Sequence, residues 1–495
     1  MSNLVSVPVV LPLVTAIALV LMEGRPRLQR RVAIGTGLVG VAAVGLLVER
    51  AACGSQILVL RLGNWGPELG IIWVVDSLAA IMLALSQLIS LATLVYAPGG
   101  LRSREVPHFY ALHQFLLAGV NGCFVTGDYF NLFVFFEVTL LASFCLICLG
   151  GRPRQVERVF PYVLLNLVGS VMFLSAIGVI YGVTGTVNMA LLATRVSSGD
   201  MPAVFWAAIG LMFTAFSIKT GLAPLFFWLP DSYPEAPLPI AAMFAGLLTK
   251  VGVYTLFRSV PLLALGESEA IQGILLVIAS ATMLLGVLGA LGRQTIRGIL
   301  SFHIISQVGY MIFGLALYSK LAVAAGIFYI VHHVVVKTAL FFAGGIAERV
   351  GGSGRLGAVK GLLVTHPWVA VGFFVPALAL AGVPPFSGFW GKFFLIHAGF
   401  GLGAWWSTGI ALVVGFLTLA SMLKIWVTTF WGEPEGQTHG HRGHDPGMLG
   451  AALGLAAVSV AIGLAAGPLF AVCERAAADL LAVTPYVDAV LGGEF

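Results

Sequence analysis

The stretch from Ser217 to Lys250 places two lysines and a helix break inside apolar sequence. Residues 201–216 are apolar enough to form most of a membrane helix, and Lys219 follows at its far end, shortly before Pro224. Proline lacks a backbone N–H and clashes with the preceding turn, so the helix should stop or kink there. A lysine at the bilayer centre costs roughly 2.5 to 3.5 kcal/mol, and non-helical backbone at that depth needs protein or water around it. This stretch therefore predicts an ion path.

The composition identifies the class of protein. Hydrophobic residues make up 59% of the 495 residues and charged residues only 9%, which is typical of a polytopic membrane protein and excludes a soluble domain with one buried core. The formal net charge of +5 could suggest nucleic-acid binding. The arginines, however, lie in short loops between apolar runs, as membrane insertion requires, so no nucleic-acid partner is expected.

Fourteen apolar segments are candidate membrane spans, and we predict an all-α polytopic fold of about fourteen transmembrane helices. They lie near residues 4–22, 32–48, 71–97, 109–126, 129–149, 159–183, 201–229 (broken), 238–258, 270–291, 298–317, 320–343, 367–400 (broken), 404–430 and 447–469. The first segment has neither a charged region before it nor a small-residue cleavage site after it. We therefore expect a retained helix and not a signal peptide.

The basic residues of the loops predict the orientation. Fifteen follow odd-numbered spans, namely Arg25, Arg27, Arg30, Arg31, Arg102, Arg104, Arg152, Arg154, Arg158, Arg293, Arg297, Arg349, Arg355, Lys360 and Arg442. Six lie in the other loops, namely Arg50, Arg61, Arg195, Arg258, Lys320 and Arg475. Because the cytoplasmic loops of membrane proteins carry the excess of Lys and Arg, both termini should lie outside.

An internal repeat follows from a second broken span. Residues 378–394 again place prolines, Pro384 and Pro385, in apolar sequence beside a lysine, Lys392. Interrupted segments at corresponding positions mark the transport site of repeat-built transporters. We expect two inverted five-helix repeats, spans 4–8 and 9–13, with discontinuous helices 7 and 12. In this register Lys250 on span 8 corresponds to Lys424 on span 13.

Four regions result from this division. Residues 1–108 contain helices 1–3, residues 109–258 the first repeat, and residues 270–430 the second, inverted repeat. Residues 431–495 contain a cytoplasmic loop, helix 14 and a C-terminal segment.

Glu137 is the acidic residue expected at mid-membrane. It follows Asp128, which marks the interface, by nine residues, and a rise of 1.5 Å per residue places it about 13 Å deep. A lysine whose glutamate partner approaches or withdraws can take up or release a proton. Glu137 could instead be a hydrogen-bonded carboxyl that ties helices together. Asp76, near the start of span 3, could be a possible relay, an interfacial residue or a helix support.

Five lysines lie inside predicted spans: Lys219, Lys250, Lys337, Lys392 and Lys424. Lys424 is a possible relay or support residue of the ion path. Because it lies near the cytoplasmic end of its span, its side chain could instead extend to the membrane interface.

Histidines accompany these lysines. His303 and the pair His332 and His333, one turn before Lys337, could relay protons as neutral imidazoles or be satisfied core residues. Three further histidines crowd a loop, where metal binding is less favoured than a solvated loop; they are His439, His441 and His444.

Redox chemistry and bound cofactors are not expected. Five cysteines, an odd number, form no disulfide framework, and Cys145 and Cys148 are interpreted as small apolar side chains. The sequence contains no P-loop, dinucleotide fingerprint, haem site or iron–sulfur site. Energy should come from an ion gradient or from a partner subunit.

Several long stretches are similar to one family of membrane proteins. They are HQFLLAGVNGCFVTGDYFNLFVFFEVTLLASF, IKTGLAPLFFWLPDSYPEAP, AAMFAGLLTKVGVYTLFR, IRGILSFHIISQVGYM, FYIVHHVVVKTALFF and AGVPPFSGFWGKF. The chain resembles the antiporter-like subunits shared by Mrp-type multisubunit cation/proton antiporters and respiratory complex I. Ser232 and Tyr233 stand where complex I subunits usually carry Ala-His, and the long C-terminal extension of the largest subunits is lacking; both departures favour the Mrp type.

The resemblance implies fourteen helices with discontinuous seventh and twelfth spans, no cofactor and partner membrane subunits. It also implies a proton path whose key positions match Glu137, Lys219, Lys250, Lys337 and Lys392. We expect a subunit of a Na⁺/H⁺ antiporter in a bacterial inner membrane, not an enzyme. The alternative is the proton-pumping subunit of a redox-driven complex, and the neighbouring genes would distinguish the two.

Overall fold

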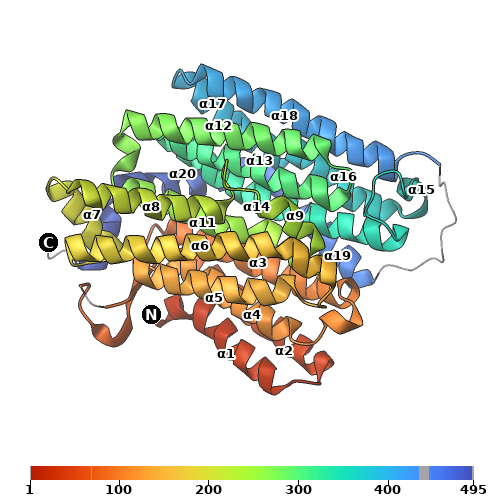
Figure 1. Ribbon diagram of the computed structural model, residues 1–495, viewed down its shortest axis with the longest axis horizontal. Helices are drawn as coiled ribbons and strands as arrows, with labels where there is room; N and C mark the ends of the chain where they lie inside the picture. Colours follow the sequence, from red (N-terminus) through yellow and green to blue (C-terminus); the bar gives the residue numbers. More distant parts are fainter. Residues whose placement is uncertain (1, 69, 434–444, 493–495) are drawn as a thin grey trace.

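The computed structural model describes residues 2–68, 70–433 and 445–492, and it is a bundle of helices that run side by side (Figure 1). Within these residues, twelve helical segments are long and apolar enough to cross a membrane. This confirms a polytopic all-α protein. The predicted number of fourteen is not confirmed, because α4 (Phe109–Val125) and α16 (Pro367–Ala381) are shorter apolar helices.

The bounds of the twelve segments agree with the predicted spans to within a few residues at most ends. They are η1 (Ser2–Ser6) with α1 (Val7–Leu21), of which Asn3–Leu21 forms the apolar segment, α2 (Pro26–Leu47) with η2 (Val48–Cys53), α3 (Ser77–Gly100), α5 (Tyr129–Ile147), α6 (Pro153–Thr184), α8 (Ala203–Thr220), α10 (Leu238–Met243) with η6 (Phe244–Leu248) and α11 (Thr249–Leu262), α12 (Glu269–Gly292), α13 (Ile296–Ala316), α14 (Lys320–Gly351), α18 (Trp405–Ile425) with η8 (Trp426–Phe430), and α19 (Pro446–Leu464).

A β-hairpin precedes α3. Strands β1 (Leu58–Arg61) and β2 (Ile72–Val75) pair antiparallel, and β2 is rich in the β-branched residues that favour strands. Asp76 then caps α3 by accepting a hydrogen bond from the backbone N–H of Ala79 at 2.9 Å. The predicted start of span 3 at residue 71 is therefore wrong, because the helix begins only after this cap.

Several short elements were not predicted. They are α7 (Met189–Ser198), α9 (Leu229–Ser232), α15 (Leu362–Thr365), α20 (Ala466–Ala482), α21 (Thr484–Leu491) and the single turns η3 (Leu62–Asn64), η4 (Ser103–Glu105), η5 (Tyr233–Glu235) and η7 (Leu265–Glu267). The last predicted span continued to residue 469, but α19 ends at Leu464 and α20 follows it. Helix α20 buries one face against α14 and α3.

Both predicted helix breaks are present. Helix α8 ends at Thr220 and is followed by Gly221, with φ of 76°, and α16 ends at Ala381 and is followed by Gly382, with φ of 92°. These values lie in the left-handed region that glycine adopts without strain. The chain resumes as the short α9 after the first break and as α17 (Ser387–Gly401) after the second. Each break contains a cis X-Pro bond, at Pro224 and at Pro385.

Paired features support the division into two repeats. Helices α6 and α14 each have 32 residues, and isolated bridges join Asp128 to Asn188 in the first region and Thr295 to Arg355 in the second. The predicted correspondence of Lys250 with Lys424 stays a prediction. Lys250 lies in the middle of the segment Leu238–Leu262, whereas Lys424 lies in the last turn of α18.

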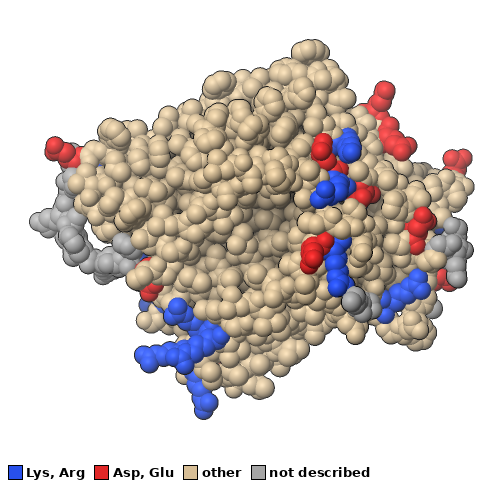
Figure 2. Space-filling view, turned by 180° about the vertical axis from the view of Figure 1, so that it is seen from behind, with Lys and Arg blue, Asp and Glu red and all other residues tan. Residues whose placement is uncertain are grey.

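The core lies in three segments. The membrane-spanning windows of α13, α14 and Leu238–Leu262 are each 94% buried, compared with 33% for α2 and for α18 with η8. Figure 2 shows the rear face as a broad band without charged side chains between charged groups at its two ends. A surface of this kind fits the hydrocarbon layer of a bilayer.

The two ends of the bundle differ. The arginine-rich side contains the loops before α2, α6 and α13 and after α14. Ion pairs on this side join Arg293, before α13, to Asp231 of α9, and Arg297 of α13 to Glu348 of α14. The hairpin side contains β1, β2 and α21, joined where Arg61 Nη2 donates to the carbonyl of Val490 at 3.2 Å.

Candidate functional site

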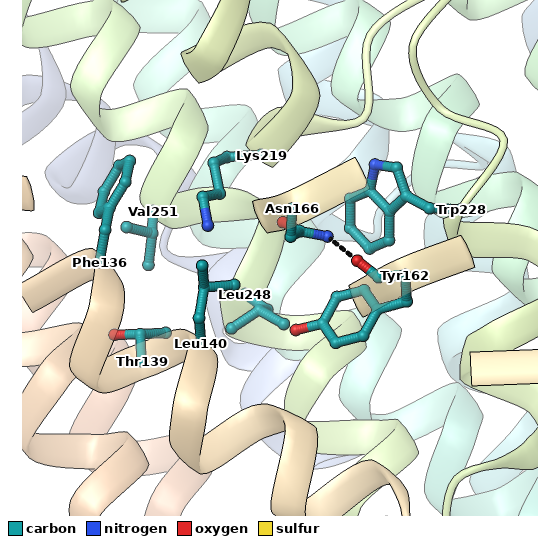
Figure 3. A pocket seen from close by; sticks show the side chains of 9 residues that line it. All are labelled: Phe136, Thr139, Leu140, Tyr162, Asn166, Lys219, Trp228, Leu248 and Val251. Carbon is teal, nitrogen blue, oxygen red and sulfur yellow. Dashed lines mark hydrogen bonds between the residues drawn. The ribbon is translucent and has the colours of Figure 1, made fainter. Parts of the chain in front are cut away.

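Lys219, in the last turn of α8, points into a small cavity (Figure 3). The cavity has a volume of about 20 Å³ and is lined by Phe136, Thr139, Leu140, Tyr162, Asn166, Lys219, Trp228, Leu248 and Val251. Lys219 Nζ and Thr139 Oγ1 are buried and have no hydrogen-bond partner among the described residues. A space of this size holds about one water molecule when polar groups face it. The ammonium can therefore meet water here.

The break after α8 forms one wall of this cavity. The indole N–H of Trp228 donates to the carbonyl of Ile218 at 2.9 Å, one of the carbonyls left free where the helix stops. On α6, Asn166 Nδ2 donates to the carbonyl of Tyr162 at 2.8 Å. These contacts fix the Trp228 and Asn166 side chains beside Lys219.

Glu137 lies next to the cavity but does not form a direct ion pair with Lys219. The residue is half-buried, and its Oε1 atom is buried without a partner in the part of the chain that the structure describes. Among the ion pairs of the described residues, none joins Lys219 Nζ to a carboxylate oxygen of Glu137 within 4.0 Å. The charges of Glu137 and Lys219 nevertheless interact at longer range. The predicted charge pair between spans 5 and 7 is therefore not a direct contact among the described residues, and its effect on the proton affinity of Lys219 stays a prediction.

Lys250 is fully buried in the middle of the bundle. The π-helical turn η6 (Phe244–Leu248) interrupts the helix just before it, and Lys250 Nζ donates to the carbonyl of Ala245 at 2.8 Å and to Thr249 Oγ1 at 3.1 Å. Such π-turns leave carbonyls free and are frequent at functional sites. Sequence reasoning predicted one uninterrupted helix here and missed this acceptor.

Lys337 and His333 continue the chain of buried groups on α14. Both side chains are 0% exposed, and Lys337 Nζ and both ring nitrogens of His333 have no hydrogen-bond partner among the described residues. The charge of Lys250 interacts with both side chains. Buried polar groups without a partner commonly bond to ordered water.

Two of the three predicted histidines of the second repeat, His303 and His332, have hydroxyl partners. His303 Nε2 lies 2.5 Å from Ser421 Oγ, and His332 Nδ1 lies 2.7 Å from Ser387 Oγ. The other nitrogen of each ring is unpartnered among the described residues. Each ring can therefore hold a hydrogen bond on one side and exchange a proton on the other.

Lys392 lies at the second break. Its Nζ donates to the carbonyls of Leu380 and Ala381, both at 3.0 Å, and lies 5.3 Å from the ring centroid of Tyr310. These carbonyls belong to the free end of α16. The prediction that Lys392 lies beside the break at Pro384 and Pro385 is confirmed, and its charge interacts with both His303 and His332.

Three further residues have structural contacts. Asp76 forms a buried ion pair with Arg258. The prediction that Arg258 lies in a loop is wrong, because α11 extends to Leu262. Lys424 Nζ donates to the carbonyls of Leu291 and Arg293, both at 2.9 Å, and so caps α12. Asp128 caps α5, and burial raises the pKa of its carboxyl to about 6.

Polar partners without charge were missed by sequence reasoning. Thr139, Asn166, Ser387 and Ser421 each lie beside a predicted site residue. A polar residue inside an apolar span could have indicated each of them. The prediction considered only ionisable residues in these spans, so it did not include them.

No group of three or more His, Cys, Asp or Glu side chains suited to a metal occurs in the described ranges. The histidine-rich loop with His439, His441 and His444 lies outside those ranges.

Comparisons with known proteins agree with the geometry. Residues 126–418 match the family described as NADH:quinone oxidoreductase/Mrp antiporter, transmembrane. A Na⁺/H⁺ antiporter subunit of type D from Alkalihalophilus pseudofirmus is 42% identical over 99% of this chain and 100% of that protein.

Two solved structures are similar over almost the whole chain. A chain of the Mrp complex from Dietzia sp. has a TM-score of 0.93 and 36% identity, with 99% of both chains covered. A chain of an archaeal membrane-bound sulfane sulfur reductase has a TM-score of 0.89 and 25% identity, with 99% of this chain and 100% of that chain covered. The chain therefore belongs to the NADH:quinone oxidoreductase/Mrp antiporter family of polytopic membrane subunits.

Proposed function

We propose that this chain is the proton-translocating subunit of a multisubunit Na⁺/H⁺ antiporter. The similarity to the antiporter subunit of A. pseudofirmus and to a chain of an Mrp complex supports this role. The observation that carries it is the row of basic side chains with buried ammonium or imidazole groups on α8, α11, α13, α14 and α17, several of them without a protein partner among the described residues. A purely structural protein would not retain such costly groups at this depth.

The path starts at Glu137 and Lys219 beside the first break. It passes Lys250 and then Lys337 in the middle of the bundle, and it ends at Lys392 beside the second break. The electrostatic interactions between Lys250 and Lys337, and of Lys392 with the histidines, support this order. Water molecules between the ammonium groups would pass the protons.

Within this path, His303, His332 and His333 relay protons between the lysines. Asp76 and Lys424 are supports, because each is engaged by fixed partners away from the row of lysines.

The membrane orientation follows from the charged loops. The arginine-rich side faces the cytoplasm of a bacterial inner membrane and both termini lie outside, because cytoplasmic loops carry the excess of basic residues. Other membrane subunits of the antiporter are the partners, and Na⁺ is the exchanged cation.

A second candidate is the proton-pumping subunit of a redox-driven complex. The similarity to a chain of an archaeal respiratory membrane complex favours it. Adjacent genes for iron–sulfur or flavin proteins would support this candidate, and adjacent genes for small membrane subunits alone would support the antiporter.

The substitution Glu137→Gln tests the proposed function. It keeps the shape of the side chain and removes its charge, so Na⁺-dependent proton exchange should disappear in everted vesicles that contain the whole complex. Glu269→Gln, an exposed residue at the start of α12, is the matched control. Normal exchange by an assembled Glu137→Gln complex would contradict the proposed path.

A further inference from the structure

One face of α11 continues the row of polar groups from Lys250 toward the hairpin side. Lys250, Tyr254 and Arg258 recur every four residues, so they share a helix face, and all three are buried. The hydroxyl of Tyr254 donates to the carbonyl of Phe124 at 2.6 Å, and Arg258 Nη2 donates to the hydroxyl of Tyr254 at 3.2 Å. The polar face thus extends beyond the lysines of the proposed path.

A buried ion pair closes this face. Arg258 Nη1 lies 2.6 Å from Asp76 Oδ2, Arg258 Nη2 lies 2.8 Å from Asp76 Oδ1, and the two side chains are only 5% and 3% exposed. Two parallel charge-assisted hydrogen bonds fix the guanidinium in one orientation. Asp76 is fixed in turn as the cap of α3.

Aromatic rings enclose the guanidinium from two directions. Its carbon lies 5.4 Å from the ring centroid of Tyr254 and 5.1 Å from that of Tyr486. Tyr486 belongs to α21, which is attached to the hairpin by the contact between Arg61 and Val490. Arg258 is therefore clamped between α3, α11 and α21.

The clamped arginine lies next to the Lys219 region. Val251, one turn before Tyr254, lines the Lys219 cavity, and the Cys123 thiol interacts with both Lys219 and Tyr254. Close to the arginine, the buried hydroxyl of Tyr129 interacts with Arg258. Arg258 follows Val251 by seven residues on α11, about 10 Å along the helix, so it lies on the hairpin side of the Lys219 cavity.

We propose that Arg258, held by Asp76, is a fixed charge barrier that closes the Lys219 and Lys250 region toward the hairpin side. This inference rests on the proposed proton path. A guanidinium does not lose its proton near neutral pH, so it cannot relay protons. A fixed positive charge in the low-dielectric interior repels a cation that approaches it, so hydronium and Na⁺ are disfavoured beside Arg258. Without it, protons could reach Lys219 from both sides and bypass the exchange.

A leak measurement in liposomes that contain the whole antiporter complex tests the barrier. A pH difference across the membrane is imposed in the absence of Na⁺, and the membrane potential is clamped with K⁺ and valinomycin. A pH-sensitive dye inside the liposomes reports how fast this pH difference decays. Arg258→Gln should accelerate the decay by about tenfold, because it removes the repelling charge. Arg258→Lys should leak more than the original protein and less than Arg258→Gln, because a lysine restores a positive charge beside Asp76 but, unlike arginine, can release its proton when it is buried.

Asp76→Asn distinguishes a charge barrier from a merely structural plug. This variant leaves the arginine charged, so the liposomes should stay tight, whereas a structural plug would leak with either single substitution. Arg297→Gln, which breaks the ion pair with Glu348 on the arginine-rich side, is the matched control and should not leak.

If Arg258→Gln alone fails to assemble, the double variant Asp76→Asn/Arg258→Gln replaces it, because it leaves no unpaired buried charge, and it should leak. An assembled Arg258→Gln or double variant that is as tight as the original protein would overturn the barrier. Glu137→Gln separates the two proposals. If the Arg258→Gln complex does not leak and the Glu137→Gln complex shows no exchange, only the barrier is refuted. If the Arg258→Gln complex leaks and the Glu137→Gln complex exchanges normally, the proton path is refuted.

Discussion

The two helix breaks use the same backbone device but treat their lysines differently. At the first break, Lys219 precedes the turn, its ammonium has no protein acceptor among the described residues, and Trp228 bonds to a free carbonyl instead. At the second break, Lys392 follows the turn and itself bonds to two free carbonyls of α16.

This difference suggests a division of tasks. The charge of Lys219 depends on Glu137 and on water in its cavity, because no fixed acceptor from the described residues stabilises the ammonium. Lys392 has two carbonyls at a helix C-terminus, where a positive charge is favoured. We expect Lys219 to exchange its proton in response to Glu137, and Lys392 to hold its proton until a neighbouring group is charged.

The largest effect is expected between the two breaks. Lys250→Ala should reduce exchange to background, because it removes the central link between Lys219 and Lys392. Lys424→Ala should be milder, since Lys424 caps α12 at the arginine-rich side. The Na⁺-dependent change in fluorescence of a pH-sensitive dye in everted vesicles, normalised to the amount of assembled complex, measures exchange by both variants. Equal losses in the two variants would contradict a path through Lys250.

A large effect is also expected for Lys392→Arg. Arginine keeps a positive charge that cannot be lost near neutral pH, so turnover should fall nearly as far as in Lys392→Ala. The same vesicle assay measures the two variants in parallel. If the arginine variant exchanges as well as the original protein, Lys392 is an electrostatic fixture, and the comparison of the two breaks fails at this point.

An intermediate effect on stability would sharpen the comparison. Lys392→Ala leaves two carbonyls of α16 without their donor, which costs roughly 1 to 3 kcal/mol per unsatisfied buried group. Lys219→Ala removes no hydrogen bond to the described residues, so it should leave stability almost unchanged. Thermal unfolding of the purified complexes in detergent compares them, and the reverse order of melting temperatures would argue against the contacts described for the two breaks.

The smallest effect is expected for Trp228→Phe. It removes the hydrogen bond to Ile218, worth about 1 kcal/mol, and loosens one wall of the Lys219 cavity, so exchange should fall by a few fold. Trp206→Phe, on the exposed face of α8, is the matched control and should match the original protein. Titration of the exchange rate with Na⁺ in vesicles detects the difference; identical curves for both variants would show that Trp228 does not position Lys219.

The spans, the breaks and the buried lysines could be predicted from the sequence because each leaves a local signal. Charges and prolines within apolar runs are sufficient to identify Lys219, Lys250 and Lys392. The β-branched run in β2 and the cap at Asp76 are also local, but they were included in an apolar segment. Arg258 was misplaced because the predicted end of its span was four residues too early.

The remaining contacts depend on segments that are far apart in the sequence. Ser421 meets His303 across 118 residues, and Asp76 meets Arg258 across 182 residues. The acceptor for Lys250 depends on the π-turn η6, which has no distinct residue pattern. Hydrophobic periodicity identifies helices, but it does not determine which polar side chains face each other across them.

The most direct test of the proposed path is the position of water between Lys250 and Lys337. A high-resolution electron cryomicroscopy map of the whole antiporter complex in lipid nanodiscs would show ordered water molecules in this region. We predict water within hydrogen-bond distance of both ammonium groups and of His333, since several of these atoms have no protein partner among the described residues. A dry, tightly packed apolar wall between the two lysines would contradict the proposed path.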